Sequence, residues 1–289
     1  MFTLGCSKDK FDARDYVIDS FLPKLQARYR GRKKLPRRLD CIRKMTPVRD
    51  QGVEGTCVGF ASATGMKEYQ EKIDYNQQVT LSPRFVYSEC KKIDGFPGEE
   101  GTTIRAAMKV LKRKGTCHED FWPYRVPQTD RPKAGAAQNA KKFRIKTYAR
   151  VRNLTQLKKT LKYNGPCVVG VYVFSSWSRM GDNGVIPLPN RYDQYRGGHA
   201  ICVVGYDNKK KLIKFKNSWG ADWGVNGYGY ISYQYIQWYM IDAWSSVDIS
   251  DSKPLRLRDV SPVALRLFVL RRAAQRRKRA RIRQRNRRR

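Results

Sequence analysis

Acidic residues are scarce in this chain of 289 residues, which has 25 aspartates and glutamates against 60 lysines and arginines and a formal net charge of +35. Twelve of the basic residues lie at positions 271–289 without a single acid, and the remaining 270 residues still carry +23. Such a charge predicts attraction to polyanions such as nucleic acid, anionic lipid or acidic proteins. The charge alone does not choose among these partners.

Long hydrophobic runs are absent as well. Residues 1–6 lack the apolar run of a signal peptide, and the apolar stretch 263–270 contains Arg266 and is too short to span a bilayer. We therefore expect no secretory signal and no transmembrane segment. A hydrophobic content of 40% and six tryptophans still favour a folded globular protein with one large core or two modest ones.

Histidine is the rarest titratable residue, with two copies, and the seven cysteines include no Cys-x-x-Cys pair. No cluster therefore has the spacing of a zinc site, and we expect neither a metal nor a cofactor. An odd number of cysteines is explained most simply by free thiols in a reducing compartment, which favours a cytoplasmic location. The oligomeric state does not follow from the sequence.

Four regions follow one another along the chain. Residues 1–46 are predicted to be a basic, partly extended arm, interpreted as a solvated linker in preference to a propeptide-like or polyanion-binding arm. Residues 47–147 carry mainly helical patterns, and residues 148–250 carry strand patterns typical of an antiparallel, barrel-like half. Residues 251–289 are an Arg-rich tail. A helical half before an antiparallel half predicts an α+β fold.

The individual elements follow from caps and periodicity. Ser82 before Pro83 predicts a helix start, and a second helix carries apolar side chains on one face within residues 102–111. A helix is also expected over 154–163. Apolar or alternating runs predict strands over residues 167–173, 200–206, 212–216 and 228–233.

Cys57 is the first candidate for chemistry. Gly52 and Gly55 precede it and permit a tight turn, and a stretch rich in small residues follows it, as in a buried helix. A cysteine at a helix start lies in the positive end of the macrodipole, which lowers the thiol pKa and favours the reactive thiolate. On this stretch alone, a packed core thiol remains the alternative.

The β half contains the partners that a nucleophilic cysteine needs. His199 follows Gly197 and Gly198 at the start of a predicted strand, whereas His118 lies in a charged stretch typical of the surface. A thiolate needs an imidazole to take its proton, and that imidazole needs a third group to fix its tautomer. Asn217, after the next strand and under Trp219, is the candidate for this third group.

Together these motifs resemble the papain family of cysteine peptidases over residues 36–235. The motifs are Gln51-Gly52-x-x-Gly55-x-Cys57, Gly198-His199-Ala200 and Asn217-Ser218-Trp219-Gly220-x-x-Trp223-Gly224-x-x-Gly227-Tyr228. The resemblance implies a papain-like fold with the active site in a cleft between the two halves. It further implies a cysteine endopeptidase or exopeptidase that hydrolyses protein or peptide substrates through a thioester.

The resemblance also assigns roles. Cys57 would be the nucleophile, His199 the general base and then the general acid, Asn217 the residue that orients His199, and Gln51 an oxyanion-hole donor. Gly101, Gly198 and Trp219 would contact substrate. Glu54 stands where secreted relatives have a half-cystine, so that disulfide is absent here, as in prokaryotic-type members.

Two alternatives remain at this stage. The same thioester would serve a transpeptidase, and a catalytically idle papain-like fold would serve as a basic protein that binds nucleic acid or another polyanion. The tail at 271–289 is the predicted polyanion contact, preceded by a predicted helix at 263–270. A disordered solubilising tail is the competing interpretation.

Overall fold

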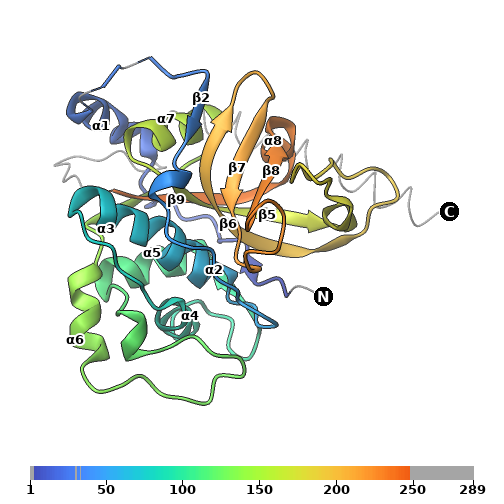
Figure 1. The fold of residues 1–289 in the computed structure, drawn as a ribbon. Helices are drawn as coiled ribbons and strands as arrows, with labels where there is room; N and C mark the ends of the chain where they lie inside the picture. The colour runs from blue at the N-terminus through green and yellow to red at the C-terminus, as the bar shows by residue number, and fades with distance from the viewer. Residues whose placement is uncertain (1–2, 30, 33, 248–289) are drawn as a thin grey trace.

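Helices and strands segregate along the chain in the computed structural model, which describes residues 3–29, 31–32 and 34–247 (Figure 1). The predicted α+β class is confirmed. The predicted helix at 263–270 and the basic tail lie outside the described residues. Among the residues that are described, no helix combines the length and the apolarity needed to cross a membrane.

The helical half is built around one long helix that begins at the predicted nucleophile. It consists of α2 (Cys57–Phe60), a π-helical segment η3 (Ala61–Lys67) and α3 (Glu68–Asp74). The other helices of this half are α4 (Pro83–Lys91), α5 (Ile104–Arg113) and α6 (Ala136–Ala140). Ser82 caps α4 as predicted, since its hydroxyl accepts the Phe85 N–H at 3.1 Å. Thr103 caps α5 in the same way.

The β half is one antiparallel sheet with the order β4-β9-β5-β6-β7-β8, and β2 pairs with β6 beside this path. The strand bounds are β2 (Arg38–Asp40), β4 (Thr147–Arg150), β5 (Cys167–Phe174), β6 (Tyr195–Asp207), β7 (Leu212–Lys216), β8 (Tyr228–Ser232) and β9 (Met240–Val247). Helices α7 (Leu154–Tyr163) and α8 (Tyr233–Tyr239) accompany it. The barrel-like expectation is corrected, because β4 and β8 end the order and do not pair to close a barrel.

Short 3-10 turns connect these elements: η1 (Ile18–Ser20), η2 (Ile42–Lys44), η4 (Glu119–Phe121), η5 (Lys141–Phe143) and η6 (Ser175–Arg179). Two large apolar clusters form most of the core, one mostly within the β half and one joining the helices to the sheet, and a third, small cluster contains Phe85 of α4 and Ala136 of α6. The second cluster contains Cys57 together with Ala200 and Cys202 of β6. The predicted nucleophile is therefore packed against the sheet.

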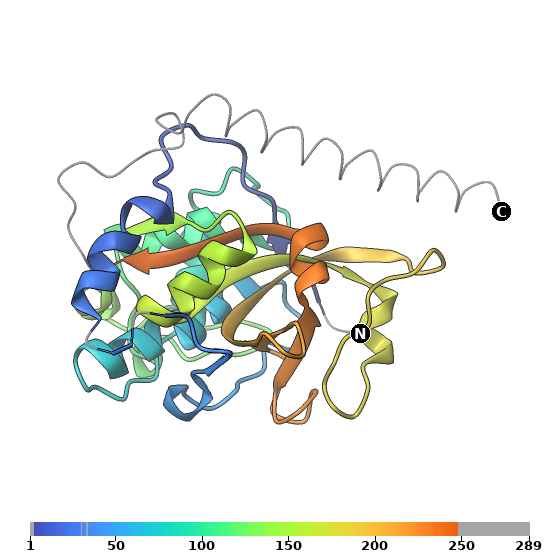
Figure 2. The same cartoon turned by 90° about the horizontal axis from the view of Figure 1, so that it is seen from above.

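The N-terminal region is not a solvated linker. Helix α1 (Leu22–Arg28) buries Leu22 and Leu25, and the preceding Ile18 and Phe21 are fully or almost fully buried in the same core cluster as the sheet. Figure 2 shows this blue helix beside α7. Upstream of it, β1 (Cys6–Ser7) pairs in parallel with β3 (Thr102–Thr103). The prediction for residues 1–46 was wrong because it rested on their composition. Charged residues dominate that composition, whereas only a few apolar side chains do the packing.

Candidate active site

Cys57 begins α2, which belongs to the helical half (Figure 1), and its side chain packs in the core cluster that includes Ala200 and Cys202 of β6. The residue is completely buried, and its sulfur accepts the backbone N–H of Ala200 at 3.4 Å. Ala200 directly follows His199 on β6. This contact joins the two halves and places the thiol beside the residue that the sequence predicts as its base.

His199 and Asn217 are brought together by neighbouring strands. Asn217 follows β7 directly, and β7 pairs with β6 so that Cys202 lies opposite Lys216. The Nε2 atom of His199 lies 2.7 Å from the Oδ1 atom of Asn217. An amide oxygen only accepts, so Nε2 carries the proton and Nδ1 is the basic nitrogen of the ring. Nδ1 is buried and has no hydrogen-bond partner among the described residues.

Aromatic rings cover the imidazole. Trp219 stacks on His199 with ring centroids 4.5 Å apart and an interplanar angle of 26°. Trp177, from η6, approaches the same ring edge-on at 6.0 Å. Both tryptophans are buried, so they keep water away from the bond between His199 and Asn217. The sequence predicted a substrate contact for Trp219, and the structure places it over the imidazole. Trp177 carried no sequence signal because no motif surrounds it.

Gln51 is held with its amide nitrogen toward the N-terminal segment and the loop before Cys57. The Ser218 hydroxyl donates to Gln51 Oε1 at 2.6 Å, and the Gln51 N–H donates to the Ser218 carbonyl at 2.9 Å. These two bonds hold the side-chain oxygen of Gln51 against Ser218 of the β half, so Nε2 points away from Ser218. Nε2 donates to the carbonyl oxygens of Glu54 at 2.7 Å and Thr3 at 3.1 Å. The amide donor is therefore already occupied by a carbonyl from the N-terminal segment.

Glu54 replaces the missing half-cystine with an ion pair. Its carboxylate pairs with the guanidinium of Arg84, whose side chain is only 4% exposed. The Arg84 guanidinium also lies 4.6 Å from the ring centroid of Tyr124, and the Tyr124 hydroxyl donates to the Gln51 carbonyl at 2.6 Å. This hydroxyl also lies 2.7 Å from Thr56 Oγ1. Arg84 and Tyr124 thus brace the loop from Gln51 to Cys57, although no sequence motif indicates them.

Burial dominates the electrostatics of the site. It raises the pKa of the Cys57 thiol to about 11, against backbone hydrogen bonds from Ala200 and Gly5 that lower it. Burial likewise lowers the pKa of His199 to about 4, against the hydrogen bond to Asn217 that raises it. The two groups are therefore a neutral thiol and a neutral imidazole at pH 7. The expected lowering of the Cys57 pKa by the helix start is not met in this closed site, because desolvation outweighs it.

The two predicted substrate-binding glycines face the N-terminal segment. A Cβ atom on Gly101 would lie 2.5 Å from the carbonyl oxygen of Gly5, and a Cβ atom on Gly198 would lie 2.1 Å from that of Cys6. The Thr102 N–H donates to the Gly5 carbonyl at 2.9 Å. Gly101 and Gly198 therefore admit a peptide backbone at close range, and residues 5–6 of this chain are that backbone.

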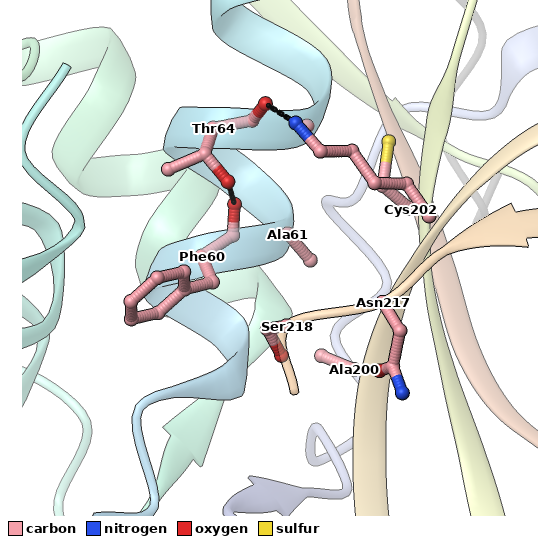
Figure 3. Close-up of a pocket in the computed structure, with 9 residues that line it drawn as sticks. Phe60, Ala61, Thr64, Ala200, Cys202, Asn217 and Ser218 are labelled. Atoms are coloured by element: carbon pink, nitrogen blue, oxygen red, sulfur yellow. Dashed lines mark hydrogen bonds between the residues drawn. The ribbon is translucent and has the colours of Figure 1, made fainter. Parts of the chain in front are cut away.

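Behind the site lies a small cavity of about 10 Å³, between residues 60–65 of the long helix, β6 at Ala200 and the chain that follows β7 at Asn217 (Figure 3). It is too small for a substrate. Beside it, the Lys216 ammonium donates to the Thr64 carbonyl at 2.9 Å, and burial raises the pKa of Glu68 to about 7. These groups support the helix and the strand end from which the site residues project.

A buried thiol beside an imidazole held by an amide oxygen is the arrangement of a cysteine-dependent acyl-transfer enzyme. The model of the papain family cysteine protease matches residues 35–248. An uncharacterised peptidase C1-like protein of Acanthamoeba polyphaga mimivirus is 29% identical over 238 residues, which are 76% of this chain and 76% of that protein. Mouse cathepsin K is 32% identical over 225 residues, and the match spans 76% of this chain and 65% of cathepsin K.

Solved structures agree. Xylellain, a cysteine protease from Xylella fastidiosa, is 30% identical with a TM-score of 0.71, and the match covers 86% of this chain and 96% of xylellain. The chain belongs to the papain family of cysteine proteases. It is a cysteine peptidase, that is, a hydrolase.

Proposed function

We propose that Cys57, His199, Asn217 and Gln51 form the catalytic site and hydrolyse peptide bonds through a thioester. The observation that carries this proposal is the bond of 2.7 Å between His199 Nε2 and Asn217 Oδ1, since it leaves Nδ1 as the base. The contact of 3.4 Å between the Cys57 sulfur and the Ala200 N–H supports it by placing the thiol next to His199.

The first half-reaction forms the acyl-enzyme. His199 Nδ1 takes the proton of Cys57, and the sulfur attacks the carbonyl carbon of the scissile peptide bond. Gln51 Nε2 and the Cys57 backbone N–H stabilise the oxyanion that forms, and two fixed donors of this kind lower the barrier. The imidazolium then gives its proton to the departing amine, the C–N bond breaks, and the thioester remains.

The second half-reaction releases the acid. His199 takes a proton from water, and the resulting hydroxide attacks the thioester carbonyl at the same oxyanion donors. The C–S bond breaks, and the imidazolium returns its proton to the Cys57 sulfur. Capture of the thioester by an amine in place of water would make the enzyme a transpeptidase, which is the alternative within this class.

Replacement of the nucleophile tests this proposal against an idle fold. Hydrolysis of a fluorogenic peptide library is measured under reducing conditions for the natural chain and for the Cys57→Ala and Cys90→Ala variants. Hydrolysis should fall to background with Cys57→Ala and persist with Cys90→Ala, a matched control because Cys90 is equally buried in the same half. Hydrolysis that survives Cys57→Ala in a folded protein would contradict the assignment.

We also propose that residues 271–289 bind a polyanion such as nucleic acid, independently of peptide hydrolysis. The support is the twelve lysines and arginines in that stretch and the net charge of +35. In the test, these twelve residues are replaced by glutamine in the full chain. Elution from heparin and binding of single-stranded DNA should shift to lower salt while peptide hydrolysis is unchanged. Unchanged heparin and DNA binding would overturn this second proposal.

All seven cysteines lie within the described residues, are buried and form no disulfide. These thiols support the further proposal that the protein works in a reducing compartment such as the cytoplasm.

A further inference from the structure

Three segments that lie far apart in the sequence concentrate positive charge at one end of the β half. Residues 28–40, 154–163 and 207–214 contain seven, three and four lysines and arginines, with two aspartates as their only acids. They run from the end of α1 through β2, along α7, and around the turn between β6 and β7, which Figure 1 shows at the same end of the sheet. Arg30 and Lys33 lie outside the described residues. The surface formed by the other residues of these segments is named the basic face here.

Asn208 joins the three segments. Its backbone N–H donates to the Arg37 carbonyl at 2.8 Å, and its Oδ1 atom accepts from Lys158 Nζ of α7 at 3.0 Å. One turn further along α7, Lys162 donates to the Lys34 carbonyl at 2.8 Å. Arg37 itself remains exposed. The basic residues of the three segments therefore belong to one continuous surface.

Both aspartates on this surface are already engaged. Asp40 pairs with Lys214 at 2.9 Å. Asp207 accepts the backbone N–H groups of Lys210 and Lys209 at 3.0 Å and 2.8 Å, and these bonds lower the pKa of its carboxyl group. Lys209 and Lys210 are exposed. The basic face therefore keeps a large excess of positive charge, which favours an anionic partner.

Tyrosine rings lie among these cations. Lys158 Nζ lies 5.1 Å from the ring centroid of Tyr233, and Lys162 Nζ lies 5.0 Å from that of Tyr29. The ring-bearing residue Tyr29 is 37% exposed. Cations interleaved with aromatic rings are typical of surfaces that bind single-stranded nucleic acid, because the cations contact phosphates and the rings stack on bases.

A cavity of about 610 Å³ lies on the same face. Its lining includes the cations of Arg38, Lys210 and Lys214 together with Leu212 and Tyr230. Lys214 and Tyr230 are opposite each other on β7 and β8, and Lys214 Nζ lies 5.6 Å from the ring centroid of Tyr230. The cavity thus offers an aromatic ring beside three cations, which suits a nucleotide base and the phosphates next to it.

The basic face is remote from the nucleophile. Asp207 lies eight residues after His199 on β6, and a strand rises by about 3.3 Å per residue, so the two residues are about 26 Å apart along the strand. A partner bound at the basic face therefore need not contact Cys57 or its neighbours.

We propose that the basic face binds single-stranded nucleic acid, with phosphates on its lysines and arginines and a base against Tyr230 in the cavity. An acidic peptide offers carboxylates, for which cations are sufficient, and a duplex keeps its bases paired; the tyrosines favour the single strand over both. Residues 271–289 carry charge of the same sign and are excluded as the occupant. The site belongs to the folded body, so it is separate from the tail proposed above and does not rest on the activity of Cys57.

A matched pair of charge reversals tests the basic face in the full chain whose twelve basic residues at 271–289 are replaced by glutamine. The face variant combines Arg37→Glu, Lys209→Glu and Lys210→Glu. The control variant makes the same change of charge at three exposed residues of the helical half, with Lys141→Glu, Lys142→Glu and Arg144→Glu.

Fluorescence anisotropy measures the binding of labelled oligothymidylate and oligouridylate across a range of salt concentrations. In the face variant, Kd should rise at least about tenfold, and the slope of log Kd against log salt should become shallower by about 2, since each lost phosphate contact removes about 0.7. The control variant should bind as its parent does. The strand that binds more tightly identifies DNA or RNA as the source. Equal affinities of the face and control variants would overturn the proposal.

Tyr230 variants test the base contact. Tyr230→Leu should weaken binding by about fivefold or more without a change in the salt slope, because the stacking is lost while the phosphate contacts remain, and Tyr230→Phe should retain the natural affinity. Undiminished binding by Tyr230→Leu, together with displacement of the strand by oligoglutamate of equal charge, would assign the face to an acidic protein instead. Peptide hydrolysis should be unchanged in every variant, and its parallel loss in a folded variant would contradict the separation of the two sites.

Discussion

The ion pair of Glu54 and Arg84 is the feature whose removal has the most specific expected outcome. Arg84 is 4% exposed and Glu54 is 26% exposed at the side chain, so the two partners differ in access to water. Glu54→Gln leaves a buried guanidinium whose remaining partners include the Arg125 carbonyl at 3.0 Å and the Tyr124 ring. Arg84→Met leaves a carboxylate that water reaches. Glu54→Gln should therefore be the more damaging change.

The magnitudes follow from this asymmetry. Stranding one charge of a fully buried pair costs about 3–5 kcal/mol, so Glu54→Gln should cost about 3 kcal/mol and Arg84→Met about 2 kcal/mol. For a domain of this size, 1 kcal/mol corresponds to about 2–4 °C in the melting temperature. We expect losses of about 6–12 °C and about 4–8 °C. The double variant should lose less than the sum, because no charge remains stranded.

Thermal unfolding of the two single variants and the double variant measures these values, with peptide hydrolysis as the second readout. Because the pair braces the loop from Gln51 to Cys57, kcat should fall by about tenfold or more in Glu54→Gln as the site residues lose their alignment. Arg125→Met is the control, since Arg125 pairs with Asp130 where both side chains are about half exposed or more, at 64% and 46%. Strictly additive losses, or an unchanged Glu54→Gln protein, would refute the reasoning.

Two further predictions concern Gln51 and Glu68. Gln51→Ala should lower kcat by about 10²–10³ with little change in KM, because it removes one oxyanion donor, and an unchanged kcat would exclude that role. Burial raises the pKa of Glu68 to about 7. Between pH 4.5 and 7 the folded state therefore binds more protons than the unfolded state. The free energy of unfolding should fall as the pH rises through this range. Urea unfolding measured across this range should show a smaller decrease in the free energy of unfolding for Glu68→Gln than for the natural chain. The exposed control Glu99→Gln should show the same decrease as the natural chain. An equal dependence on pH in Glu68→Gln and the natural chain would contradict the Glu68 assignment.

The residues that motifs carry could be predicted from the sequence. Cys57, His199, Asn217 and Gln51 each sit in a short pattern whose spacing relative to strands and helices follows from local rules, and the structure brings all four to one place. The long-range partners could not be predicted in this way. Arg84 and Trp177 reach the site through tertiary packing, and an arginine after a helix-starting proline or a tryptophan in a short turn has no local signature of that contact.

The N-terminal region shows how composition misleads when few residues carry the packing. A helical spacing relates the four buried residues Ile18, Phe21, Leu22 and Leu25. Lysines, arginines and two prolines surround them, so the average composition of the region is typical of a solvated arm. Strand β9 was missed for a related reason. Its central segment contains the buried polar residues Asp242, Ser245 and Ser246, whose partners come from distant parts of the chain.

The protonation state of Cys57 depends on which of two opposing effects is larger. A helix start stabilises a nearby anion by about 0.3–1 kcal/mol, and one pKa unit corresponds to 1.36 kcal/mol, so the macrodipole alone moves a thiol pKa by less than about one unit. Burial pushes the pKa of Cys57 upward to about 11, and Gly5 lies against the backbone of Gly55 in the loop before Cys57. Desolvation therefore outweighs the helix start at Cys57, and the buried thiol is neutral at pH 7.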